Sequence, residues 1–204
     1  MKLYYHPRSR YSQKVLIALY EKAMPFTPIV LFPGDPADRA ELRKLTPLGK
    51  VPLLVLEDGW KIPESTTIIE YLDPRGSGPR LIPEDLDLAR QARFHDRITD
   101  LYVTESIGTL VHEPTATERV ARAKERLEAM FTGFDAHLAE RQWVMGDTFT
   151  LADCSLIPAL ANFRDAYPYD KWKHVTAYFQ RSLERPSVAR VRRELAAHEA
   201  KVAS

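Results

Sequence analysis

A stretch rich in proline and glycine divides this sequence into two parts of different character. Asp73–Pro83 contains three prolines and two glycines. Proline cannot continue a helix, and proline with glycine is typical of the exposed linkers between domains. A chain of 204 residues is long enough for two small domains, each with its own core. We therefore predict domains at residues 1–75 and 84–204, joined by a linker at residues 76–83.

The part before the linker alternates strand and helix patterns. Lys2–Tyr5 has the composition of a short strand, and the following apolar residues recur at the spacing of one helix face, at Tyr11, Val15, Ala18 and Leu19. Phe26–Leu31 is again β-rich. Its Pro28 has no N–H for a sheet ladder, which predicts a strand at the edge of the sheet. A further helix is predicted over Pro36–Leu45.

A hairpin and a third helix complete the first part. Leu53–Leu56 is apolar, and Trp60–Ile62 follows it after Asp58-Gly59. This dipeptide favours a type I′ turn, in which both central positions have positive φ. Ser65 then begins a helix that carries apolar residues on one face, and a serine at this place suits an N-cap. The predicted order is βαβ–α–ββα with a mixed four-stranded sheet.

The part after the linker has helical patterns throughout. Glu84–His112 is one long helical pattern. Thr115–Glu118 has the spacing of a capping box, and Thr150–Asp153 has the same spacing with Asp in place of Glu. Pro186 suits the first turn of a last helix, whose apolar side is formed by Val188, Val191 and Leu195. We expect about five helices and no strand, which makes the second domain all-α.

Charge and cysteine content indicate what kind of partner and compartment to expect. Lys and Arg number 29 against 28 Asp and Glu, so no general attraction to nucleic acid or to an anionic membrane is expected. The single cysteine, Cys154, excludes an internal disulfide and fits a reducing compartment. No apolar run has the length of a signal peptide or a membrane span. The expected location is the cytoplasm.

Four short motifs follow one another along the chain, at Thr46–Pro52, Pro63–Leu72, Gly146–Asp153 and Arg185-Pro186. In order and spacing they resemble four motifs of the cytosolic glutathione S-transferase superfamily: Asn-Pro-x-Gly-Lys-Val-Pro, Glu-Ser-x-x-Ile-x-x-Tyr-Leu, Gly-x-x-x-Ser/Thr-x-Ala-Asp and Arg-Pro. Thr46 stands where the family has Asn. The resemblance covers nearly the whole chain. It implies an N-terminal thioredoxin-like α/β domain, an all-α C-terminal domain, and the bacterial-type serine-hydroxyl subgroup.

The resemblance places a glutathione site on the first two motifs. In the resembled fold the Val51-Pro52 bond is cis, which turns the backbone N–H and C=O of Val51 toward the cysteinyl backbone of glutathione, like one more strand. Ser65 and the helix N-terminus would bind the γ-glutamyl carboxylate, Glu64 the ammonium group, and Lys50 the glycyl carboxylate. The plainer alternatives are a simple turn at Val51-Pro52, helix-dipole stabilisation by Glu64 and a solvated Lys50.

His6–Val15 contains the candidates for stabilising the glutathione thiolate. A free thiol has a pKa of about 8.5, so the anion needs a hydrogen-bond donor or positive charge at neutral pH. Lys14-Val15 matches the family's Arg/Lys-Val, which places Ser9 at the catalytic serine position. A role for Ser9 as helix N-cap is compatible with this assignment. Ser12 is the second choice.

The same segment departs from the family pattern. Arg10 stands where Pro or Cys is frequent, and His6 and Arg8 stand where small residues are common. A cation facing the sulfur would favour the thiolate, so Arg10 is a possible assistant to Ser9. The adjacent tyrosines Tyr4-Tyr5 rank third as hydroxyl donors. The segment contains no cysteine, which argues against the subgroups that form a mixed disulfide with glutathione.

The resemblance implies that the second substrate, a small electrophile or a peroxide, lies between the two domains. Candidate lining residues are Arg8, Tyr102, Ser106 and His112, with Leu110 and the surroundings of Trp172. The basic residues among them hint at a polar or anionic co-substrate. Glutathione is the expected co-substrate, and no metal is expected.

Three functions are open at this point. The chain is a glutathione transferase that adds the thiolate to an electrophile or reduces a peroxide, a glutathione-dependent isomerase or dehalogenase, or a non-catalytic binding or assembly module on the same fold. The complete set of Val51-Pro52, Glu64-Ser65 and nearby hydroxyls favours an enzyme, because an assembly module need not retain it. The resemblance also implies a homodimer.

Overall fold

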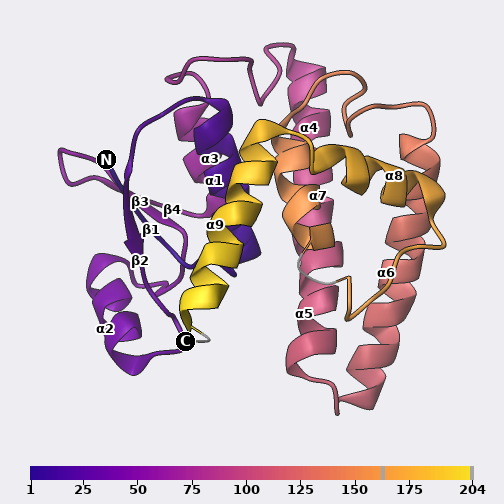
Figure 1. Cartoon of the computed structure of the whole chain (residues 1–204), viewed down its shortest axis with the longest axis horizontal. Helices are drawn as coiled ribbons and strands as arrows, with labels where there is room; N and C mark the ends of the chain where they lie inside the picture. The colour runs from indigo at the N-terminus through magenta and orange to yellow at the C-terminus, as the bar shows by residue number, and fades with distance from the viewer. Residues whose placement is uncertain (162–163, 203–204) are drawn as a thin grey trace. The chain divides into compact units, whose positions relative to one another are not determined.

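The computed structural model describes residues 1–161 and 164–202, and the contacts among them form two compact units. The first unit contains Met1–Arg80 together with helix α9 (Pro186–Val202), and the second contains Leu81–Arg185. Figure 1 labels the strands and the α-helices of both units. The predicted domain 84–204 includes residues 162–163 and 203–204, which lie outside the described residues.

The first unit is built on a four-stranded mixed sheet in the order β2-β1-β3-β4. The strands are β1 (Lys2–Tyr5), β2 (Thr27–Val30), β3 (Leu53–Val55) and β4 (Lys61–Pro63). Strand β1 is parallel to β2 and antiparallel to β3, and β3 is antiparallel to β4. Pro28 lies in the edge strand β2, where its missing N–H costs no ladder bond. The predicted βαβ–α–ββα fold is confirmed.

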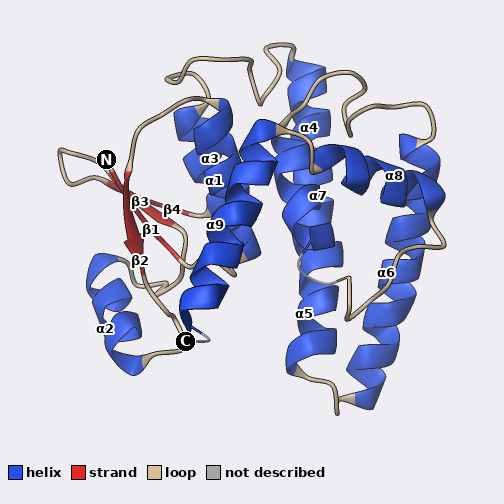
Figure 2. Ribbon diagram, in the orientation of Figure 1, coloured by secondary structure: helices blue, strands red, loops and turns tan. Residues whose placement is uncertain are grey.

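Four helices accompany the sheet: α1 (Arg10–Glu21), α2 (Pro36–Leu45), α3 (Ser65–Leu72) and α9. Helices α1 and α3 pack together on one side of the sheet (Figure 2), and α2 lies apart from them. The core joins Leu3 and Leu54 of the sheet to Leu19 and Ile68 of these helices, and all four side chains are fully buried. In α2 only Leu42 is buried, so that helix covers little of the core.

The hairpin was predicted correctly, but its turn type was wrong. Gly59 has φ of 85°, whereas Ala23 and Glu64 are the described non-glycine residues with positive φ, so Asp58 does not have the conformation that a type I′ turn needs. Instead, the Gly59 N–H donates to the Leu56 carbonyl at 3.1 Å, and the Leu56 N–H donates to the Trp60 carbonyl at 2.8 Å. This is a three-residue loop with glycine in the left-handed position.

Helix α9 packs against α1 and belongs to the first unit. Its buried apolar residues are Val188, Val191 and Leu195. The Tyr20 hydroxyl of α1 donates to the Glu194 carboxylate at 2.7 Å. This grouping differs from the division predicted from the sequence, which placed α9 with the second domain. The physical reason is that α9 buries its apolar face on α1.

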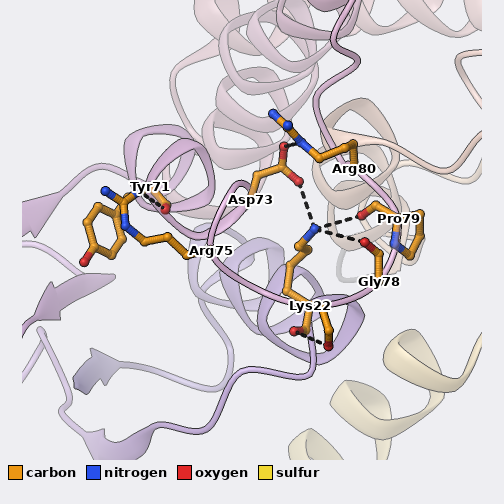
Figure 3. A network of polar contacts seen from close by, with 8 residues as sticks. Lys22, Tyr71, Asp73, Arg75, Gly78, Pro79 and Arg80 are labelled. Carbon is orange, nitrogen blue, oxygen red and sulfur yellow. Dashed lines mark hydrogen bonds and ion pairs between the residues drawn. The ribbon is translucent and has the colours of Figure 1, made fainter.

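The linker is bonded to the end of α1 (Figure 3). Lys22 and Asp73 are each 1% exposed, and the Lys22 ammonium lies 3.4 Å from the Asp73 carboxylate. The ammonium also donates to the carbonyls of Pro79 at 3.0 Å and Gly78 at 3.4 Å, and Arg80 pairs with Asp73 at 2.7 Å. A segment predicted only as a connector is thus fixed by a buried charge network.

The second unit is helical, as predicted. Its helices are α4 (Leu86–Ile98), the π-helical segment η1 (Thr99–Thr104), α5 (Glu105–His112), α6 (Thr117–Leu138), α7 (Leu151–Ala161) and α8 (Lys173–Ser182). The long pattern predicted over Glu84–His112 is helical, but the π-helical segment in its middle was not predicted. None of the helices in the described ranges combines the length and apolarity of a membrane span.

Of the two predicted capping boxes, the one before α6 is absent and the one before α7 is present. Helix α6 begins at Thr117 after Ala116, with no side-chain cap, so the box at Thr115–Glu118 was wrong. The box at α7 is present: the buried Asp153 carboxylate accepts from the Thr150 N–H at 2.8 Å. It also accepts from the Val144 N–H at 2.9 Å and the Tyr178 hydroxyl at 3.0 Å. Asp153 therefore joins three segments around the start of α7.

Candidate functional site

The strand register brings the predicted glutathione-binding segments to one end of the sheet. Tyr4 of β1 lies opposite Leu53 of β3, and Leu53 lies opposite Pro63 of β4. The loop that follows β1, the Val51-Pro52 segment before β3 and the Glu64-Ser65 segment after β4 therefore meet there. All three belong to the first unit.

The loop before α1 is held by hydrogen bonds in both directions between the loop and the helix. The Gln13 side chain donates to the Pro7 carbonyl at 2.6 Å, and the His6 N–H donates to the Ser12 hydroxyl at 3.4 Å. Ser12 is fully buried. Ser9 is half-buried at the end of this loop, where its hydroxyl caps α1 by accepting from the Ser12 N–H at 3.3 Å. Ser9 is therefore the more accessible of the two candidate hydroxyls.

The cations of this segment have different surroundings. Arg10 is the first residue of α1 and is half-buried, whereas Arg8 is exposed and pairs with Glu199 of α9 at 3.0 Å. The His6 ring packs against the rings of Phe32 and His198. Burial lowers the pKa of His6, and nearby His198 and Arg8 lower it further, so its neutral form is favoured.

The tyrosines that rank third lie at the end of β1. Tyr5 lines a groove with Tyr20 and Glu194 on the α9 side of α1. Burial raises the pKa of Tyr5, and the Glu194 carboxylate raises it further. These surroundings favour the neutral phenol and connect Tyr5 with α9.

Val51 has the backbone geometry that an added strand requires. The Val51-Pro52 bond is cis, as the resemblance implied. Val51 makes no backbone hydrogen bond with the described part of the chain, so its N–H and C=O are open to a ligand. The preceding turn is closed by Thr46, whose hydroxyl accepts from the Leu48 N–H at 3.4 Å. Lys50 is exposed beside it.

Glu64 and Ser65 form the start of α3. Ser65 is the first helical residue and is 5% exposed, whereas Glu64 takes the N-cap position without a side-chain cap bond. The prediction that Ser65 is the N-cap was therefore wrong by one residue. Glu64 has φ of 70° and ψ of 124°, a combination that few non-glycine residues adopt. Such strained residues cluster at binding sites, where the surrounding structure fixes them.

Sequence reasoning used Lys14 only as part of a motif and missed its place in this site. Lys14 is 1% exposed, and its ammonium donates to the Thr66 hydroxyl of α3 at 2.9 Å. The bond ties α1 to the start of α3. The available signal was a lysine directly before the apolar run Val15–Leu19, which is buried.

The residues predicted for the second substrate, other than Arg8, belong to the second unit. Tyr102 is 42% exposed and lies under the Arg126 guanidinium, and His112 is the exposed last residue of α5. Ser106 is 2% exposed, and its hydroxyl has no hydrogen-bond partner among the described residues. Trp172 is buried against Phe131, so it belongs to the core of the helices.

Within the described ranges, no group of three or more His, Cys, Asp or Glu side chains could hold a metal ion.

Comparison with known proteins gives matches over both units. The glutathione S-transferase N-terminal domain matches residues 3–80, and the glutathione S-transferase C-terminal domain matches residues 117–181. Glutathione S-transferase hmp2 of Hypomyces subiculosus is 31% identical over 185 residues, covering 81% of this chain and 86% of that protein.

Solved structures of glutathione S-transferases are also similar to this chain. The glutathione S-transferase of Methylobacillus flagellatus with glutathione bound has a TM-score of 0.86 at 25% identity, covering 93% of this chain and 98% of that one. The glutathione S-transferase of Methylobacterium radiotolerans in complex with glutathione sulfonate has a TM-score of 0.83 at 26% identity, covering 93% of both chains. With both domains matched, an open Val51 backbone and a helix start at Glu64-Ser65, this chain belongs to the glutathione S-transferase family.

Proposed function

We propose that glutathione binds across the end of the sheet where the Ser9, Val51 and Ser65 segments meet. The open backbone of Val51 carries this proposal, because an N–H and a C=O beside a strand pair with an extended peptide as a further strand does. The cysteinyl residue of glutathione pairs with the Val51 backbone in this way.

The charged groups at the two ends of glutathione bind residues on either side of Val51. The γ-glutamyl carboxylate binds the Ser65 hydroxyl and the free N–H groups at the start of α3, where the helix dipole favours an anion. The exposed Glu64 carboxylate binds the γ-glutamyl ammonium. The exposed Lys50 ammonium binds the glycyl carboxylate.

Ser9 then donates its hydroxyl to the sulfur. The hydroxyl sits at the N-terminus of α1, so a donor and the helix dipole act together on the same anion. Each unit by which they lower the thiol pKa needs about 1.4 kcal/mol of preference for the thiolate. The thiolate forms a carbon–sulfur bond with an electrophilic carbon as its leaving group departs. Alternatively it breaks the O–O bond of a peroxide, is oxidised to a sulfenic acid with release of an alcohol or water, and is converted by a second glutathione to the disulfide and water.

The test is titration of the glutathione thiol bound to the protein, followed by thiolate ultraviolet absorbance. We expect Ser9→Ala to raise the bound thiol's pKa by about one to two units and to slow transfer about tenfold or more. Ser12→Ala is the matched control, because Ser12 is fully buried and binds the His6 N–H. Ser12→Ala should lower the stability of the protein and leave the pKa of the bound glutathione thiol unchanged. An unchanged pKa and rate in Ser9→Ala would transfer the role to Ser12 or Arg10.

The second substrate is proposed to be a small electrophile, and Arg8, which is next to Ser9 in the first unit, is the candidate contact. The basic residues near Ser9 favour a polar or anionic compound, although Arg8 is already paired with Glu199. Rates with a matched panel of neutral and anionic electrophiles test this preference. Equal rates for the two groups would contradict it.

A homodimer is proposed from apolar surface that a single chain leaves exposed. Trp60 is 69% exposed and borders a groove of about 500 Å³ with Pro63, Tyr71 and Arg75. In the second unit Leu86 is 86% exposed. Exposed apolar surface of this kind is typical of protein–protein contacts, and a second copy of the chain is the expected partner.

The proposed location is the cytoplasm. Glutathione is the thiol that keeps this compartment reduced, so the co-substrate is abundant there. The buried free thiol of Cys154 fits a reducing compartment.

A further inference from the structure

Lys14 occupies an unusual place for a charged residue. It lies in the middle of α1, is 1% exposed, and is surrounded along the helix by buried residues. An ammonium group loses its hydration when buried, so a buried lysine must be held by hydrogen bonds or opposite charge. Its position is therefore set by its contacts.

The contact at Thr66 leads to the glutathione site. The Lys14 ammonium donates to the Thr66 hydroxyl at 2.9 Å. Thr66 is the second residue of α3 and follows Ser65 directly. Since this hydroxyl accepts from the ammonium, it keeps its own proton for donation. The bond therefore places a positive charge beside the first turn of α3, where the helix N–H groups begin.

We propose that Lys14 is a positioning residue for the γ-glutamyl carboxylate of glutathione, acting through Thr66. It fixes the first turn of α3 against α1, and its charge adds to the helix dipole at the place where the carboxylate binds. This inference rests on the proposed glutathione site at Glu64-Ser65.

A second buried lysine, Lys22 at the C-cap of α1, provides a comparison that separates this role from simple support of the core. Lys22 is also 1% exposed, but its ammonium binds Asp73 and the carbonyls of Gly78 and Pro79 in the linker. The two lysines are equally buried and differ in what they hold. Lys22 therefore provides the matched control for Lys14.

The experiment measures binding of two ligands by calorimetry with the whole chain. S-methylglutathione has no free thiol, so its affinity is independent of thiolate formation. The second ligand is the same molecule without the γ-glutamyl α-carboxylate. We expect Lys14→Met to weaken binding of S-methylglutathione about tenfold, and binding of the decarboxylated ligand less than about threefold. Lys14→Arg keeps the charge and should restore most of the affinity.

Thr66→Val tests the route through α3 without changing the size of the side chain. It should weaken S-methylglutathione binding as Lys14→Met does, and the double variant should lose little more, because the two residues act as one pair. Thr67→Val is its control, since Thr67 is exposed on the next position of α3. Lys22→Met should lower thermal stability and leave both affinities unchanged.

The outcomes separate this inference from the function on which it rests. If wild type does not bind S-methylglutathione, the proposed site itself is wrong. If wild type binds and Lys14→Met weakens both ligands equally, Lys14 supports only the fold. If Lys14→Met does not fold, Thr66→Val decides: an equal loss for the two ligands overturns the proposal, and a loss confined to S-methylglutathione supports it.

Discussion

Glu64 is held in a backbone conformation that glycine would adopt at lower cost. Its φ of 70° brings its Cβ atom close to the carbonyl group of the preceding residue, and conformations of this kind cost about 1–3 kcal/mol. The surrounding strand β4 and helix α3 hold it there. Because the strain coincides with a proposed ligand contact, stability and binding should change in opposite directions at this residue.

Glu64→Gly should raise the free energy of unfolding by about 1 kcal/mol, because relief of strain exceeds the extra freedom that glycine gains in the unfolded chain. The same change removes the carboxylate for the γ-glutamyl ammonium, so glutathione affinity should fall about tenfold or more. Denaturant unfolding and calorimetry measure the two effects. Glu64→Ala is the control: it loses affinity without a gain in stability. A destabilised Glu64→Gly variant would contradict the role of strain.

His95 is a partly buried imidazole beside a second one. Its ring centroid lies 4.7 Å from that of His137, and its Nδ1 atom is buried without a hydrogen-bond partner in the described ranges. Burial, with smaller contributions from nearby His137 and Arg141, lowers the pKa of His95 to about 4. The unfolded chain takes up a proton near pH 6.5, whereas the folded chain does not until about pH 4.

Stability should therefore fall as the pH is lowered from 6.5 to 4, because the unfolded state binds more protons throughout that window. We expect His95 to contribute about 1–2 kcal/mol to this loss, less than a fully buried ring would, because it keeps some solvent exposure. His95→Phe should lose correspondingly less stability than wild type in urea titrations at the two pH values. His112→Gln, at an exposed histidine, should behave as wild type does. Equal losses in wild type and His95→Phe would refute this.

At the scale of elements, the linker depends on Lys22. Lys22→Met should lower the free energy of unfolding by about 2–3 kcal/mol, because it removes the charge that holds two linker carbonyls. The loss stays below that of a fully orphaned buried charge, because Arg80 still pairs with Asp73. Limited proteolysis should also become faster within residues 74–80.

The control for this prediction is Lys44→Met in α2. Lys44 pairs with Glu41 at 2.9 Å, and both side chains are well exposed, so the loss should be about 0.5 kcal/mol or less. Equal losses at Lys22 and Lys44 would show that burial of the linker network does not matter.

Elements whose boundaries depend on local chemistry could be predicted from the sequence. Pro28 marked an edge strand, Pro186 marked the start of α9, and Asp153 marked the cap of α7. The π-helical segment could not be predicted, because its extra residue per turn leaves no local composition signal. Nor could the turn type at Asp58-Gly59, because a type I′ turn and a three-residue loop both accept a glycine there.

The candidate site shows the same division. The segments at Ser9, Val51 and Ser65 could be predicted from motifs, because the backbone roles of these segments need particular residue types. The link from Lys14 to Thr66 depends on the packing of α1 on α3, which spacing along the chain does not encode. For the same reason, the packing of α9 on α1 was missed.

At the scale of the whole molecule, the exposed groove beside Trp60 predicts self-association. Trp60→Glu places a charge in an apolar contact and should raise the dimer dissociation constant about 100-fold or more, as expected for a buried aromatic anchor. Analytical ultracentrifugation over a concentration series measures this. Val30→Glu makes a comparable change at the opposite edge of the sheet and should leave the dimer intact. A wild-type chain that sediments as a monomer would remove the basis of the prediction.

The packing of α9 on α1 has a consequence for how the chain is made. Residues 81–185, which form the second unit, leave the ribosome before α9 does, whereas the first unit gains its last helix only after residue 202 has been synthesised. During translation the α1 surface that α9 covers is therefore exposed while the second unit is already complete. Nascent chains should be most dependent on chaperones in this interval, and a gene fragment that ends at residue 80 would retain the exposed surface permanently.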